Sequence, residues 1–160
     1  MQASLPELRL WLEFAQNPPT LEECEIRLRE NHARFLLRQN LQFEIFDASS
    51  DAFLGRIGFP FVNWKVPKFE IGYWLDSKEA GKGYITEAVL ALTGLAFAVL
   101  GAKRVEIFCN ARNSASRRVA EKAGFTLECI QKTLRQTIEI QLERVTPAFT
   151  LGFRASKFAP

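Results

Sequence analysis

A glycine-rich segment in the middle of the chain has the composition of an anion-binding loop. The segment reads Lys78-Glu-Ala-Gly81-Lys82-Gly83-Tyr84-Ile85-Thr86, between an apolar stretch and a stretch of helical character. Glycine lets a backbone approach a ligand closely, and the first amides of a helix carry free N–H groups and positive partial charge. Two lysines add cationic charge and Thr86 adds a hydroxyl. The segment predicts a phosphate or pyrophosphate site, with a simple strand-to-helix turn as the alternative.

The glycine spacing excludes two common nucleotide-binding motifs. The Walker pattern GxxxxGK[ST] is absent from the chain. The dinucleotide fingerprint GxGxxG would need a glycine where Thr86 stands. The predicted anion site therefore belongs to neither class.

A second polar segment, Asn110-Ala-Arg-Asn113-Ser114-Ala-Ser116, follows the next stretch of strand character. Asn113 is suited to cap the N-terminus of a helix, and Ser116 would then lie in its first turn. Capping alone and contact with a ligand are both consistent with these residue types.

The remaining polar residues give no other catalytic or metal centre. The chain has three cysteines, Cys24, Cys109 and Cys129, and the single histidine His32. They match no zinc-site spacing, and nothing near His32 resembles a nucleophile motif. Three scattered cysteines predict no disulfide framework, so we expect a reducing, cytoplasmic location and no metal.

Composition indicates one soluble domain. The chain has 160 residues, of which 48% are hydrophobic and 24% charged, enough to bury a core. With 21 basic and 18 acidic residues, it lacks the strong positive charge of a nucleic-acid binder. The most apolar run, residues 88–102, is shorter than the ~20 residues that span a bilayer. We therefore expect neither nucleic acid nor membrane as a partner.

Periodicity and turn residues predict a mixed α+β order. We expect helices at residues 5–14, 20–39, 84–100 and 113–122, and strands at 41–46, 53–59, 69–75, 103–109 and 125–130, with strand candidates at 138–142 and 148–153. A capping box, Thr20 with Glu23, begins the second helix. The early strands predict antiparallel pairing and the later ones a helix-linked crossover.

In order and spacing, these segments resemble the Gcn5-related N-acetyltransferase (GNAT) superfamily, and within it the RimJ/RimL branch of protein N-terminal acetyltransferases. The matching pieces are Glu70-Ile-Gly-Tyr-Trp-Leu75, Lys78-x-x-Gly-x-Gly83-Tyr with Thr86-Glu-Ala, Asn110-x-x-Asn113-x-x-Ser116, and Glu121-Lys-Ala-Gly-Phe-Thr-Leu-Glu128. The resemblance covers about residues 5–135 and implies a GNAT-like fold, a central mixed sheet flanked by helices.

The resemblance implies acetyl-CoA as co-substrate and direct acetyl transfer to an amine. The strand at residues 71–75 would bind the pantetheine arm through its backbone, the glycine loop would hold the pyrophosphate, and Asn113 and Ser116 would lie near the pantetheine and the sulfur. The implied cofactor-binding residues are Tyr73, Trp74, Leu75, Lys78, Gly81, Lys82, Gly83, Tyr84, Ile85, Thr86, Asn110, Asn113 and Ser116.

Two residues are candidates for proton transfer. Ser116 matches the position that the family offers as proton donor to the departing thiolate. Glu70 is the candidate general base, directly or through water, because burial can raise the pKa of a carboxylate towards neutral. The alternative for Glu70 is a solvated strand-end charge or a cross-strand partner of a lysine. Trp64, Trp74 and Tyr73 are candidates for an acceptor groove or for packing, and Cys109 for a buried apolar position.

The chain departs from the family at both ends. Members begin with an Arg/Leu-rich strand, which is absent here and would leave an unpaired sheet edge. Relatives end with a strand containing Asp and Tyr, and residues 136–160 contain neither. The leading prediction is an acetyltransferase acting on a protein N-terminal amine, and the unpaired edges favour a homodimer that pairs its sheets. The alternatives are a small-amine or antibiotic acetyltransferase, a non-catalytic CoA-binding relative, and an interaction module without ligand.

Overall fold

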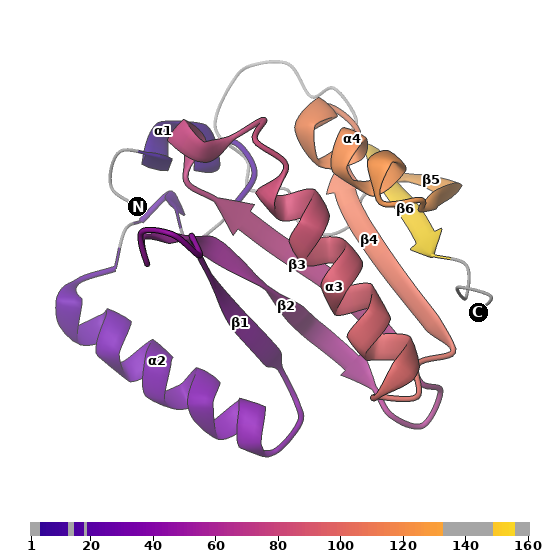
Figure 1. Ribbon diagram of the computed structural model, residues 1–160, viewed down its shortest axis with the longest axis horizontal. Helices are drawn as coiled ribbons and strands as arrows, with labels where there is room; N and C mark the ends of the chain where they lie inside the picture. The colour runs from indigo at the N-terminus through magenta and orange to yellow at the C-terminus, as the bar shows by residue number, and fades with distance from the viewer. Residues whose placement is uncertain (1–3, 13–14, 18, 133–148, 156–160) are drawn as a thin grey trace.

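The described residues form a mixed sheet with helices packed against it (Figure 1). In the computed structural model these are residues 4–12, 15–17, 19–132 and 149–155. The elements, in chain order, are α1 (Leu5–Leu8), α2 (Leu21–Leu36), β1 (Leu41–Phe46), β2 (Phe53–Asn63), β3 (Lys68–Leu75), η3 (Ser77–Glu79), α3 (Tyr84–Ala98), β4 (Arg104–Asn110), α4 (Ser114–Lys122), β5 (Thr126–Lys132) and β6 (Phe149–Ala155). The strand candidate at 138–142 lies outside the described residues.

The six strands are ordered β1-β2-β3-β4-β6-β5. Only the central pair β3–β4 is parallel, and every other neighbouring pair is antiparallel. The chain crosses from β3 to β4 through α3, as the helix-linked crossover predicts. Among the described strands β1 lies at one edge and pairs with β2 alone, in agreement with the expected unpaired edge.

One face of the sheet carries the hydrophobic core. Alternation along β3 and β4 sends every second side chain to this face, which α3 and α4 cover (Figure 1). The most buried contributors include Phe59, Phe69, Ile71, Val89, Val105, Ile107, Ala120 and Phe153. The sheet and its two crossover helices therefore fix the relative positions of the β3 and β4 ends.

The opposite face carries a row of charges across four strands. Glu106 on β4 is 4% exposed. It pairs with Lys68 on β3, Oε2 to Nζ at 2.9 Å, and with Arg104 beside it. Arg104 also pairs with Glu128 on β5, which pairs with Arg154 on β6 at 3.2 Å. The Glu106–Lys68 pair fastens β3 to β4 where the two strands begin.

The helices at the N-terminal end are shorter than the sequence predicts. The capping box at Thr20 and Glu23 is present. However, α2 ends at Leu36 instead of near Gln39, because Arg38 turns to a positive φ of 55°. Its guanidinium stacks over the Trp64 ring and its carbonyl accepts from Trp64 Nε1 at 2.7 Å. The expected helix at 5–14 is helical at Leu5–Leu8 and continues as turns up to residue 11.

Across the described parts of the chain, no helix combines the length and the apolar character needed to span a membrane.

Candidate active site

The two central parallel strands pair along only part of their length. The ladder runs from Lys68 opposite Arg104 to Ile71 opposite Ile107, while β3 continues to Leu75 and β4 to Asn110. Beyond that point β3 stays paired with β2 and β4 with β6. The arrowheads of β3 and β4 accordingly stand apart in Figure 1. The resulting gap lies at the carboxyl ends of parallel strands, where open α/β sheets place their ligands.

The glycine loop leads from β3 to the N-terminus of α3 at this end of the gap. Gly81 and Gly83 have backbone φ angles of 84° and 98°. L-residues that carry a side chain rarely adopt such angles. A Cβ at either position would meet no described atom within 4 Å. The glycines are therefore required by backbone conformation, and the space beside them is open. Among the described residues no side chain caps α3 at Gly83, so its first amides are available to an anion.

The lysines of this loop differ in their surroundings. Lys82 Nζ lies 2.8 Å from Glu79 Oε2, and this hydrogen bond raises the pKa of Lys82. Lys78 is exposed, and its backbone N–H donates to Asp76 Oδ1 at 3.1 Å. Both cations lie within five residues of the uncapped helix start, as the sequence predicts.

The N-terminal segment braces this loop. Ser4 is completely buried. Its hydroxyl donates to Asp76 Oδ1 at 2.8 Å and accepts from the Ser77 N–H at 2.9 Å. Glu7 adds a bond of 3.2 Å from the Ser77 hydroxyl. Nothing in the sequence pointed to Ser4, because its partners lie more than seventy residues away.

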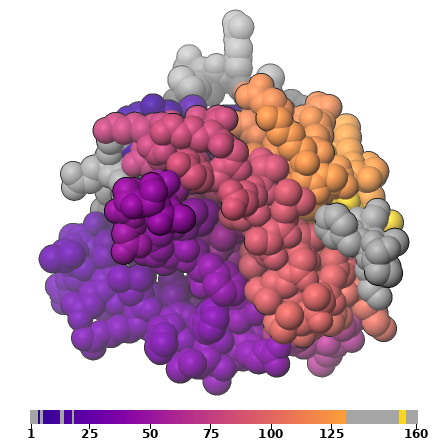
Figure 2. All heavy atoms as spheres, viewed as in Figure 1, coloured from indigo at the N-terminus to yellow at the C-terminus, as the bar shows by residue number. Residues whose placement is uncertain are grey.

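The turn between β1 and β2 braces the other side of the loop. Tyr84, the first residue of α3, donates from its hydroxyl to Asp47 Oδ2 at 3.1 Å. The other carboxylate oxygen of Asp47 accepts from Ser49 and Ser50, and these bonds hold the pKa of Asp47 well below its usual value. Figure 2 shows this dark purple turn against the pink segment that precedes α3. Tyr84 therefore has a structural role in addition to its predicted place in the cofactor loop.

The second polar segment forms the start of α4 at the end of β4. Asn113 Oδ1 accepts from the Ser116 backbone N–H at 3.0 Å, which confirms its capping role. Asn110 Oδ1 accepts from the Arg112 N–H at 2.9 Å and shapes the turn between strand and helix. The Ser116 side chain contacts Tyr73, which packs against the core, so it lies on the core face of the sheet, beside the gap.

Tyr73 connects β3 to α4. Its hydroxyl lies 2.8 Å from Ser116 Oγ and donates to the Ser116 carbonyl at 3.2 Å. Burial raises the pKa of Tyr73 to about 12, despite the bond to Ser116. Burial also raises the pKa of the Cys109 thiol, which hydrogen-bonds with Ser116. The sequence indicated Tyr73 for its backbone, for an acceptor groove or for packing, and gave no sign of the bond that its hydroxyl makes with Ser116.

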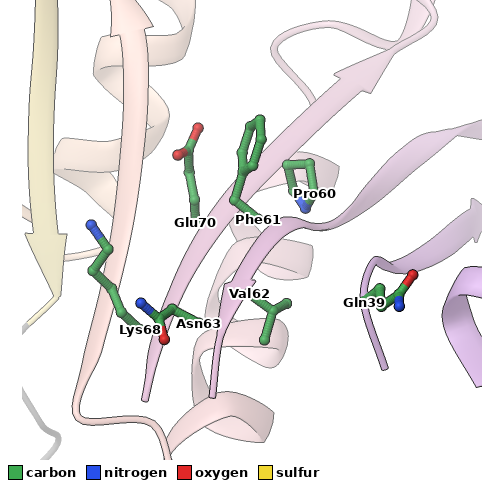
Figure 3. Close-up of a pocket in the computed structure, with 7 residues that line it drawn as sticks. All are labelled: Gln39, Pro60, Phe61, Val62, Asn63, Lys68 and Glu70. Carbon is green, nitrogen blue, oxygen red and sulfur yellow. The ribbon is translucent and has the colours of Figure 1, made fainter. Parts of the chain in front are cut away.

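Glu70 lies on the other face of the sheet from Ser116. Its core-facing neighbours Phe69 and Ile71 are buried, so Glu70 points away from them. It lines a pocket of about 320 Å³ with Gln39, Pro60, Phe61, Val62, Asn63 and Lys68 (Figure 3). Figure 3 shows Glu70 and Phe61 pointing the same way from adjacent strands. Lys68, which lines the same pocket, has its Nζ paired with Glu106.

The two tryptophans named with Tyr73 pack against other aromatic rings. Trp64 meets the buried Phe69 edge-on with centroids 5.1 Å apart. Trp74 meets Phe53 at 5.7 Å. Within the described ranges no group of three His, Cys, Asp or Glu side chains is placed to hold a metal ion.

The chain belongs to the GNAT acetyltransferases: the model of the acetyltransferase (GNAT) domain matches residues 2–126. Its RimJ/RimL-like character within this family is confirmed by its relatives. It is 37% identical over 114 residues to the probable N-acetyltransferase YjcK of Bacillus subtilis, a match that covers 71% of this chain and 63% of that protein.

Two further known proteins are similar to this chain. The chain is 31% identical over 129 residues to the ribosomal-protein-serine acetyltransferase of Escherichia coli, covering 78% of this chain and 71% of the relative. Its fold matches that of RimL, a ribosomal L7/L12 alpha-N-protein acetyltransferase solved in complex with coenzyme A, with a TM-score of 0.82 and 22% identity over 96% of this chain and 82% of the other. The chain spans less than two thirds of the length of YjcK.

Proposed function

We propose that this protein transfers the acetyl group of acetyl-CoA to a primary amine, foremost the α-amine of a protein N-terminus. The observation that carries the proposal is the gap between β3 and β4, bordered by an uncapped helix start with two lysines and by a serine hydroxyl. The match to acetyltransferases of ribosomal proteins supports the choice of acceptor.

The site residues fit the parts of acetyl-CoA. A pyrophosphate suits the open space at Gly81 and Gly83, the first amides of α3 and the charge of Lys78 and Lys82. A pantetheine arm carries amides, and a strand that leaves its parallel partner can pair with them. In this proposal residues 73–75 of β3 contact the arm, and the thioester lies near Ser116.

The chemistry needs one new bond and two proton transfers. The amine nitrogen attacks the thioester carbonyl, a C–N bond forms and the C–S bond breaks. The departing thiolate takes a proton from the Ser116 hydroxyl on one face of the sheet, and the serine oxygen takes a proton in turn from water. The ammonium proton leaves to Glu70 on the other face, directly or through water. Groups on opposite faces can both reach a thioester lying between two diverging strands.

A binding and turnover assay on the same sample tests the proposal. Acetyl-CoA at 100 times its Kd should stabilise the protein by about 2.7 kcal/mol. Release of the CoA thiol should then depend on an added acceptor, either a peptide with a free N-terminal serine or a set of small amines. A peptide with an acetylated N-terminus is the control. Stabilisation without turnover on any amine would indicate a CoA-binding relative without catalysis, and no stabilisation would refute the cofactor site.

A further inference from the structure

The Tyr73 hydroxyl joins the two walls of the gap. Tyr73 lies on β3 beyond the last residue paired with β4, and Ser116 lies in the first turn of the helix that follows β4. Their side chains meet at 2.8 Å although they are 43 residues apart in sequence. The bond therefore spans the opening at the point where the strands have already separated.

The number of hydrogens constrains what this bond can do. A phenol and a serine hydroxyl each carry one hydrogen and accept through lone pairs. Either hydroxyl can donate in the 2.8 Å contact. In the arrangement in which Tyr73 gives its single hydrogen to Ser116 Oγ, the hydrogen of Ser116 is not needed between the two residues. The hydrogen of Ser116 can then point to a third atom. A hydroxyl that accepts one hydrogen bond also becomes a stronger donor in another.

The surroundings of Tyr73 keep it in the protonated form. It lies on the core-facing side of β3, and burial holds its pKa at about 12, so the phenol keeps its proton at neutral pH. The neighbouring Cys109 thiol also keeps its proton, because burial raises its pKa. Tyr73 therefore keeps a hydrogen that it can donate to Ser116, and it is not a source of protons.

We propose that Tyr73 is a positioning residue for Ser116: it orients the serine hydroxyl so that its hydrogen faces the sulfur of the leaving CoA. The inference rests on the proposed acetyl transfer and deepens it. Tyr73 itself need not touch the reacting atoms, because it acts on the serine oxygen from the side of β3.

A double-mutant cycle on the full chain tests this role. Tyr73→Phe removes the hydroxyl and keeps the ring. We expect kcat to fall about 3- to 10-fold, the equivalent of one hydrogen bond, with KM for acetyl-CoA within about twofold of the wild type. Ser116→Ala should lower kcat at least as far. In the Ser116→Ala background, Tyr73→Phe should have no further effect, because the group it orients is gone.

A Ser116→Thr variant keeps a hydroxyl and should keep the dependence on Tyr73. Equal losses of kcat from Tyr73→Phe in the wild-type and Ser116→Ala backgrounds would overturn the inference, since they would mean that Tyr73 supports only the fold. An increase in KM with unchanged kcat would overturn it as well. If the wild type binds acetyl-CoA and acetylates no amine, the proposed function itself fails before any variant is compared.

A measurement that does not depend on activity tests the same bond even if the Tyr73→Phe variant does not fold. The chain has two tyrosines, so 3-fluorotyrosine labelling gives two fluorine resonances. Ser116→Ala should shift the resonance of Tyr73 and leave that of Tyr84, which bonds to Asp47, in place. Two unmoved resonances would mean that the Tyr73–Ser116 bond does not exist in solution, and the inference would fall.

Discussion

Glu79 and Lys82 form an ion pair, Oε2 to Nζ at 2.8 Å, in the loop that precedes α3. Lys82 is thus already neutralised by the loop in which we place a pyrophosphate. A phosphate oxygen must take the place of the Glu79 carboxylate or share the cation with it, so the loop itself weakens the attraction between Lys82 and an anion.

Glu79→Gln should therefore tighten acetyl-CoA binding. The exposed pair is weak, so we expect the Kd to fall about two- to fivefold, with a steeper dependence on salt. Titration calorimetry at low and high ionic strength measures both. Glu25→Gln is the matched control, because Glu25 forms a similar exposed pair with Arg29 on α2. Weaker binding of acetyl-CoA by Glu79→Gln would contradict the assignment of Lys82.

Gly83→Ala should damage the cofactor loop by strain alone. The φ of 98° costs an alanine about 1–2 kcal/mol, although its Cβ would meet no described atom. We expect roughly tenfold weaker binding of acetyl-CoA. Gly94→Ala is the control: it lies inside α3 with equal room, and it should stabilise the fold by about 0.5–1 kcal/mol without changing affinity. Equal affinities of the two variants would argue against the loop.

Ser4→Ala should weaken acetyl-CoA binding, although Ser4 lies more than seventy residues before the glycine loop in the sequence. It removes two hydrogen bonds from the buried Ser4 to Asp76 and Ser77. We expect the melting temperature to fall by about 2–4 °C and the Kd for acetyl-CoA to rise about fivefold, while kcat at saturation stays unchanged. Thermal melts with and without acetyl-CoA, and initial rates, give the three values. Unchanged affinity in a destabilised variant would limit Ser4 to a role in the fold.

Alkaline pH should reveal the burial of Tyr73. An unfolded tyrosine has a pKa near 10, and Tyr73 in the folded chain has one of about 12. Below pH 10 both states keep the proton. Between pH 10 and about 12 only the unfolded chain loses it, so unfolding becomes easier by up to about 1.4 kcal/mol per pH unit.

Tyr73→Phe lacks this ionisation. Urea unfolding of the wild type and of Tyr73→Phe at pH 8, 10 and 11 isolates it, because the other groups titrate in both proteins. The advantage of the wild type should shrink by about 1 kcal/mol from pH 10 to pH 11. A difference that stays constant over this range would show that the phenol is not buried in solution.

Much of the candidate site could be predicted because its determinants are local. The capping box at Thr20, the Asn113 cap and the glycine loop each rest on bonds or backbone angles within a few residues. The same is true of the alternation that makes β3 and β4 strands. The order of these segments was also enough to indicate the GNAT family, and the family match confirms it.

The tertiary structure decided how these local pieces meet. The sequence names Tyr73, Ser116 and Glu70, but only the fold places the first two in contact and the third on the opposite face of the sheet. Likewise, only the fold brings Ser4 to Asp76, 72 residues away. Bonds across such separations depend on strand order and helix packing, which no local pattern contains. The sequence alone therefore determined the family and the local motifs, whereas the sheet, by pairing β3 with β4 over only part of their length, created the gap between them.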